Sequence, residues 1–397
     1  MRAGEVLHNV LAPAGVRLDA RLWRRLYGAV EALVRSRQVV LMELARQYPE
    51  ATRVAAPLKA LDRLLSNRRL QQARGALYGA ALQRLWPRCR TVIVVDWCVL
   101  KADESLHLLR AALPVGGRAL PVWDEVHGQA QLGHAEVHTA FLARLRRLLP
   151  VDSRPIVVTD AGFRMPWFRS AEALGLACIG RVRGLTQVRP VGEQDWVPVQ
   201  AFVEMEDGRL LDLGLCEISK THPQRARLVV CKRPPRGRKD HGVHGRPRRS
   251  GAARAHARGA REPWVLAVSP ALADLSAEEV VRDYARRMQI EESFRDLKDP
   301  RQGAALRHAL TRKAPRMEIL ILLHALASVL AWWRGLLARQ QHQDQRLLAH
   351  GQAIRRAATR ATLSLWRIGW ELLRRGWPPD DTGDGAALAH PCRPLPA

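Results

Sequence analysis

The sequence predicts an α/β protein in which helical regions flank a mixed sheet. Two β-branched apolar runs, TVIVVDW at 91–97 and PIVVTD at 155–160, are too continuous for half-exposed strands and indicate buried central strands. Between them, apolar segments flank Gly116 and Gly117, a composition typical of a tight hairpin. A strand, a hairpin, a helix and a second buried strand in succession favour an α/β domain.

The N-terminal residues favour helices. Apolar residues recur at helical spacing before breaks near Pro49 and Pro57, which predicts a helical domain over 1–88. Arginines cluster around a loop in this domain, namely Arg63, Arg68 and Arg69. They are interpreted either as a solvated helix face or as a surface that contacts DNA phosphates, and composition leaves both open.

The first part of the α/β core is predicted over 89–184. Its hairpin strands are expected at 106–115 and 120–126, followed by helices at 134–149 and 166–174. The next residues, 185–270, favour a β-rich insertion, with strands at 196–204, 209–218, 226–232 and 264–269. Within it, 232–261 is basic and has almost no large apolar residues, so it cannot bury enough surface to fold alone.

Helical patterns return in the second part of the core, 271–345. Helices are expected at 276–299 and 314–341. The apolar run 317–333 is the only candidate membrane span, but it is short and contains ionisable residues, so we expect a core helix. A helical region with a disordered tail is predicted over 346–397.

The charge balance narrows the class of partner. The chain of 397 residues has 64 Lys plus Arg against 38 Asp plus Glu, a formal charge of +26, which calls for nucleic acid or an anionic membrane. The N-terminus does not read as a signal peptide, so we expect a cytoplasmic protein. Cysteines without a CxxC pair argue against a zinc site or a disulfide framework, and no phosphate-binding Gly-rich loop with a Lys is apparent.

Acidic residues end both predicted central strands. Asp96 and Asp160 lie where a carboxylate emerges from the sheet, and two such strands side by side bring the carboxylates together. Close carboxylates repel unless a cation joins them, and their hard oxygens favour Mg²⁺ or Mn²⁺. A strand-end Asp that merely caps a turn is the alternative. His134 and His138, four residues apart, lack an evident third ligand, which favours a surface or supporting role.

The predicted 276–299 helix carries a second polar pattern. Its members are Tyr284, Arg287, Glu291 and Lys298, which share one face of a continuous helix. Glu292 would be rotated by about 100° from that face, so Glu291 is preferred as the functional carboxylate. An apolar stripe lies beside it, formed by Ile290, Phe294 and Leu297. An ordinary amphipathic helix with salt bridges is the alternative.

These motifs resemble those of IS4-type DDE transposases. The four-residue pattern reproduces the family's Y-(2)-R-(3)-E-(6)-K signature, and VVDW, TDAGFRMPWF and a strand ending GRVRG are similar to its other blocks. LDRLLSNRRL and the stretch around Arg307 extend the resemblance to roughly 55–340. TDAGF departs from the family, in which an Arg often follows the Asp, so a phosphate or acidic contact made there is in doubt.

The resemblance implies an RNase H-like catalytic core and a metal-dependent DNA transposase. Asp96, Asp160 and Glu291 would form a triad that binds two Mg²⁺ or Mn²⁺ ions. The substrates would be double-stranded DNA at the terminal inverted repeats and the target, bound by a homodimer. Trp264 looks like the aromatic that the family inserts where a base is flipped, with a core Trp as the alternative. A related nuclease without strand transfer, and a transposase-derived DNA-binding protein without catalysis, are the competing hypotheses.

Overall fold

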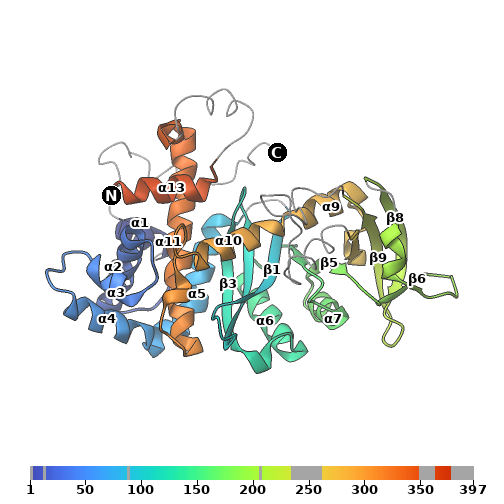
Figure 1. Cartoon of the computed structure of the whole chain (residues 1–397), viewed down its shortest axis with the longest axis horizontal. Helices are drawn as coiled ribbons and strands as arrows, with labels where there is room; N and C mark the ends of the chain where they lie inside the picture. The colour runs from blue at the N-terminus through green and yellow to red at the C-terminus, as the bar shows by residue number, and fades with distance from the viewer. Residues whose placement is uncertain are drawn as a thin grey trace, which may run out of the picture. The chain divides into compact units, whose positions relative to one another are not determined.

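The fold is mixed α/β, as predicted. The computed structural model describes residues 3–11, 15–86, 90–204, 208–233, 262–347 and 363–376. The chain forms two compact units, a first unit of residues 1–153 with 288–397 and a second unit of residues 154–287 (Figure 1). The chain therefore leaves the first unit after Ser153 and returns to it at Met288.

The first unit begins with helices, as the periodicity predicts. These are α1 (Ala3–Leu11), α2 (Ala20–Ser36), α3 (Leu41–Arg46), α4 (Ala55–Leu65) and α5 (Arg68–Leu85). The predicted loop between α4 and α5 is confirmed, because Asn67 caps α5 by accepting the Leu70 N–H at 2.9 Å.

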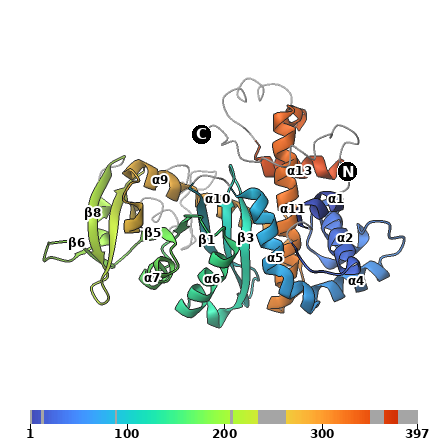
Figure 2. The same cartoon turned by 180° about the vertical axis from the view of Figure 1, so that it is seen from behind.

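The sheet of the first unit is an antiparallel meander. It comprises β1 (Val92–Val99), β2 (Leu106–Pro114) and β3 (Ala119–Gly128), and α6 (Ala135–Leu148) follows it. The predicted hairpin is confirmed: Gly116 and Gly117 have φ angles of 83° and 85°, which residues with a Cβ rarely adopt. Figure 2 shows α6 and the helical region from behind.

The predicted core helix is α11 (Ala314–Gln340), the long orange helix of Figure 1. Its length and hydropathy alone would allow it to cross a membrane, but 94% of that apolar window is buried inside the protein. It packs against α2, α5, β3 and α13 (Leu365–Arg374). The core interpretation is thus confirmed.

A buried ionic network links this core to the sheet. Arg110 on β2 donates two hydrogen bonds to Asp124 on β3, at 2.6 and 2.9 Å, and both side chains are fully inaccessible. Tyr78 on α5 donates to the same carboxylate at 2.8 Å, and Arg74 pairs with Glu318 on α11 at 2.5 Å.

The second unit contains a mixed sheet in the order β4-β5-β10-β9-β8-β6-β7. Its strands are β4 (Ile156–Thr159), β5 (Ala177–Val182), β6 (Gln187–Pro190), β7 (Val197–Pro198), β8 (Leu210–Ile218), β9 (Gln224–Cys231) and β10 (Trp264–Val268). β4 and β5 are parallel, and β5, β10, β9 and β8 pair antiparallel in turn. The helices are α7 (Met165–Ala173) and α9 (Ala277–Ala285).

Two predictions about elements were wrong. The strand expected at 196–204 is limited to two residues, because Pro198 offers no N–H to the ladder, and a 3-10 helix (Val199–Glu204) follows. The helix expected at 276–299 is divided into α9 and α10 (Met288–Lys298). Most of the basic run, residues 234–261, and the predicted disordered tail from 377 lie outside the described residues.

Candidate active site

Asp96 lies near the end of β1, where the burial pattern changes. The preceding four residues of the strand are buried, whereas Asp96 and Trp97 are partly exposed. One carboxylate oxygen of Asp96 accepts the Trp97 backbone N–H at 2.8 Å. Asp96 pairs with Arg110 on β2, so their side chains share one face of the sheet.

Helix α10 covers the face that carries Asp96. The Arg110 guanidinium lies 5.7 Å from the centre of the Phe294 ring. Cys98, two residues after Asp96 and therefore on the same face, lies within electrostatic reach of Lys298. Burial raises the pKa of the Cys98 thiol, and the Lys298 charge opposes this effect.

The contacts of α10 fix which of its faces meets the sheet. The predicted apolar stripe is confirmed, since Ile290, Phe294 and Leu297 are all buried. Glu291 precedes Phe294 by three residues and Lys298 by seven, so all three share one side of the helix. Glu291 thus lies on the side from which Phe294 and Lys298 reach β2 and β1.

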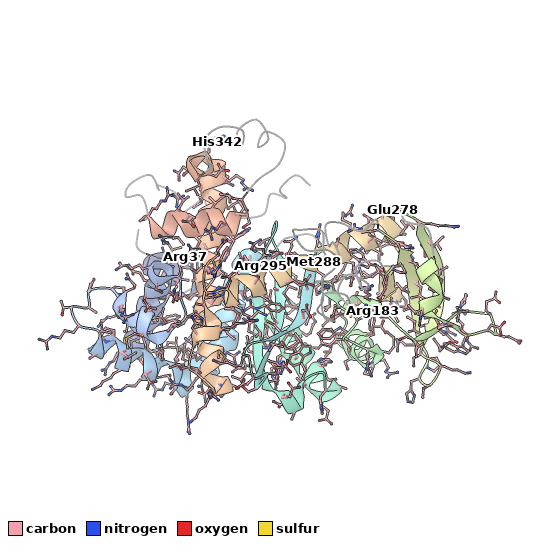
Figure 3. The ribbon with its side chains drawn as sticks, in the orientation of Figure 1. Arg37, Arg183, Glu278, Met288, Arg295 and His342 are labelled. Carbon is pink, nitrogen blue, oxygen red and sulfur yellow. The ribbon has the colours of Figure 1, made fainter. Side chains whose placement is uncertain are left out.

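Glu292 points toward other partners. It pairs with Arg295, one turn along α10, and lies 3.9 Å from Arg118. Figure 3 labels Met288 and Arg295, which belong to the first and last turns of this helix. These ion pairs explain the position of Glu292 without a metal.

The opposite face of β1 is tied to α6. Trp97 donates its indole N–H to Nε2 of His138 at 2.9 Å. Burial, followed by the charges of His127 and His134, lowers the pKa of His138 to about 4. At neutral pH His138 is therefore a buried, uncharged anchor for the residue that follows Asp96, which corresponds to the supporting role and not to a surface position.

Asp160 belongs to the second unit and directly follows β4. Its Oδ1 accepts the Gly162 backbone N–H at 2.8 Å in the turn before α7. A Cβ at residue 162 would lie 3.0 Å from this oxygen, so the glycine leaves room beside the carboxylate.

Tyr284 and Arg287 form a cluster in the same unit. Burial raises the pKa of Tyr284, the charges of Arg287 and Arg181 oppose it, and Asp160 adds to it. The cluster therefore gathers two cations around a phenol that is 3% exposed, within electrostatic reach of Asp160.

The Trp264 ring borders this cluster. Its centroid is 4.8 Å from that of Tyr284 in an edge-on arrangement, and the Arg233 guanidinium lies 4.6 Å from the Trp264 ring centre. The side chain is partly exposed, unlike the fully buried residues that follow it on β10.

The predicted single helix face is interrupted between these groups. The Arg287 N–H bonds to the Tyr284 carbonyl at 3.0 Å, three residues back, so the chain tightens and α9 ends before α10 begins. Tyr284 and Arg287 belong to the second unit, and Glu291 and Lys298 belong to the first. The signature is thus divided between α9, the turn at Arg287 and α10, and the prediction of one continuous helix for it was wrong.

The site contains residues that sequence patterns did not single out. Arg181 on β5 lies beside Tyr284, and its buried Nε has no hydrogen-bond partner among the described residues. Cys98 and Arg110 flank Asp96 on the α10 side. In the sequence, only the GRVRG segment pointed to Arg181. Cys98 and Arg110 become apparent only from the register of β1 with β2.

Within either unit, the described His, Cys, Asp and Glu side chains form no group of three that could hold a metal. The acidic candidates are divided, with Asp96 and Glu291 in the first unit and Asp160 in the second. The carboxylate oxygens nevertheless fit a hard divalent cation, because one oxygen of each Asp is directed by a backbone N–H.

The arginines at the α4–α5 junction are exposed. Arg63 is in the last turn of α4, and Arg68 and Arg69 open α5. Arg69 lies 3.6 Å from Asp19, and both side chains are largely exposed, so this pair contributes little to stability.

Comparison with known proteins identifies a family. A family model described as a transposase DDE domain matches residues 87–330. No curated protein matches the chain significantly. The matched residues include both candidate Asp positions and the whole of α9 and α10.

Proposed function

Because the chain belongs to the transposase DDE domain family, we propose that it is a cut-and-paste transposase of the IS4 type with an RNase H-like core. It would nick double-stranded DNA at the terminal inverted repeats of a transposon and join the freed end to target DNA. The observation that carries the proposal is the family match over both Asp positions and the α10 helix.

Asp96, Asp160 and Glu291 are the proposed catalytic residues and the ligands of two Mg²⁺ or Mn²⁺ ions. Such ions activate an attacking oxygen and stabilise the leaving oxygen. The proposal requires the two units to bring these carboxylates together when DNA and metal bind. The attachment of α10 to β1 supports the pairing of Asp96 with Glu291.

The basic residues of the site would bind the scissile strand. Lys298 and Arg287 would hold phosphates through charge-assisted hydrogen bonds, which fix the strand in line for attack. Tyr284 is buried and lies within electrostatic reach of Arg287, so we assign it to positioning Arg287. Arg63, Arg68 and Arg69 would add phosphate contacts from α4 and α5.

The chemistry would proceed in two displacements. Water attacks the phosphodiester at the transposon end and releases a 3′-OH. This hydroxyl then attacks the opposite strand or, later, target DNA. We expect a homodimer in the DNA complex, acting in the cytoplasm on nucleoid DNA, and we place the helical DNA-binding domain at 1–88.

The test uses the full chain, Mg²⁺ and a labelled duplex that carries the DNA flanking the gene. Asp96→Asn and Asp160→Asn should each abolish nicking while binding to the duplex persists. Asp152→Asn, an exposed residue before β4, is the matched control and should nick normally. Normal nicking by either site variant would overturn the assignment, and nicking without strand transfer would favour the related nuclease.

A further inference from the structure

Leu310 is a large aliphatic residue at the surface of the first unit. Its side chain is 92% exposed, in the loop between a 3-10 helix (Leu306–His308) and α11. Single exposed apolar residues are common and need no explanation by themselves. Leu310 differs because of the segment that presents it, residues 306–313, which we call the 306–313 loop. The backbone of this loop is held by the protein core, and its exposed side chains are mostly cationic.

The backbone of this loop is held from within. Ala309 and Thr311, which flank Leu310, are buried, so the chain alternates between the core and solvent. The Ala309 carbonyl accepts a hydrogen bond from Lys101, just after β1. Leu306, at the start of the loop, is completely buried. Leu310 is therefore presented by a fixed backbone.

The residues that lead into the loop are equally constrained. The Ala304 carbonyl accepts the Val39 N–H at 2.9 Å, and the Ala304 N–H donates to the Asp296 carbonyl at 2.7 Å. A Cβ at Gly303 would overlap that same Asp296 carbonyl. The start of the loop is thus attached both to α10 and to the segment after α2.

Cations surround the exposed leucine. Arg307, Arg312 and Lys313 are exposed, as is His308. The nearest acidic partner is Asp103, 3.8 Å from Arg312, and both side chains are more than half exposed, so the pair is weak. The loop therefore presents one apolar side chain, Leu310, on a fixed backbone between positively charged side chains.

We propose that the 306–313 loop binds the minor groove of double-stranded DNA and that Leu310 inserts between adjacent base pairs. The inference rests on the proposed function for its partner, but it assigns a contact separate from the acidic site. Apolar wedges of this kind partly unstack a base step and kink the duplex, while neighbouring cations neutralise phosphates. A membrane surface fits less well, because interfacial segments present a whole apolar helix face.

The experiment measures binding and base unstacking without catalysis. The full chain, in EDTA, is titrated into an A·T-rich duplex that carries fluorescein at one end and 2-aminopurine at its centre. Wild-type protein should raise 2-aminopurine fluorescence, which reports unstacking. Leu310→Ala should bind about tenfold more weakly, because less apolar surface is buried, and should lose the fluorescence rise.

Two controls separate the insertion of Leu310 from the general loss of an exposed leucine and from the loss of a positive charge. Leu185→Ala removes a residue that is 77% exposed in the second unit and should change neither signal. Lys313→Ala should weaken binding and lower the salt dependence by about one phosphate contact, with the fluorescence rise at saturation retained. Circular dichroism checks that each variant is folded.

The outcomes are distinct. Equal affinity and equal fluorescence rise for Leu310→Ala and wild type would overturn the wedge, whereas metal-dependent cleavage of flanking DNA would still support the transposase. About tenfold weaker binding and a lost fluorescence rise in Leu310→Ala, with no cleavage by wild type under any metal, would support the insertion of Leu310 and contradict the proposed activity. Tighter binding of anionic lipid vesicles than of the duplex would overturn the choice of partner.

Discussion

Replacement of Asp124 by Asn should severely destabilise the first unit. The Asp124 carboxylate accepts two bonds from Arg110 and one from Tyr78, and neither charged side chain is exposed. Asn keeps the shape but leaves the Arg110 charge buried without a counter-charge, which costs about 3–5 kcal/mol. Against a typical total stability of about 5–15 kcal/mol, this is about a fifth or more.

Urea denaturation followed by tryptophan fluorescence checks this value. With a slope of about 3 kcal/mol per molar urea, the midpoint for Asp124→Asn should fall by about 1–2 M. The combined Arg110→Met, Asp124→Leu and Tyr78→Phe variant removes all three groups and should recover most of the loss. A shift under about 0.3 M for Asp124→Asn, or a combined variant no better than the single one, would refute the reasoning.

Four further predictions concern the acidic site and the core. Glu291→Gln should eliminate nicking at saturating DNA and Mg²⁺. Glu292→Gln should change the free energy of unfolding by less than about 1 kcal/mol and leave nicking intact, since its ion pairs are partly exposed to solvent. Trp264→Ala should permit first-strand nicking but slow hairpin formation, the attack of the freed 3′-OH on the opposite strand, as followed on a denaturing gel. Equal loss of both steps with a lower melting temperature would favour a core role. Burial, with a smaller contribution from a nearby arginine, lowers the pKa of His324 to about 3, so the unfolded chain binds more protons below about pH 6.5 and stability falls as the pH falls. His324→Gln should remove about 1.4 kcal/mol per pH unit from that slope in urea titrations at pH 4–6. Gly369→Ala should cost about 3 kcal/mol in the same titrations, because its Cβ would overlap the backbone of α11.

The sequence predicts the central elements well because their patterns are local. A continuous β-branched run predicted β1, and two adjacent glycines predicted the hairpin turn. The wrong strand at 196–204 was also predicted from a local pattern, which gave too little weight to Pro198 and its missing N–H. The divided helix escaped prediction because no Pro or Gly marks the break at Arg286 and Arg287.

For the acidic site, sequence could identify residues but not their surroundings. The choice of Glu291 over Glu292 depended on helical phase and stays a prediction; the ion pairs of Glu292 with Arg295 and Arg118 could not be read from the sequence. Arg181 could not be identified from the sequence, because what distinguishes it is its burial near Tyr284, which lies about a hundred residues further along the chain. Long-range neighbours of this kind leave no periodic signal in one sequence.

The crossing of α11 and α13 has a consequence for how copies of this gene can vary. A Cβ at Gly335 would overlap the Leu365 carbonyl, and one at Gly369 would overlap the Ala331 carbonyl, so the two backbones touch. Any base change at the first or second position of a glycine codon introduces at least that Cβ or a stop. Copies that still produce a folded protein should therefore differ at these two codons only in the third, silent base. A change of amino acid at either codon would mark a copy that no longer encodes a folded protein.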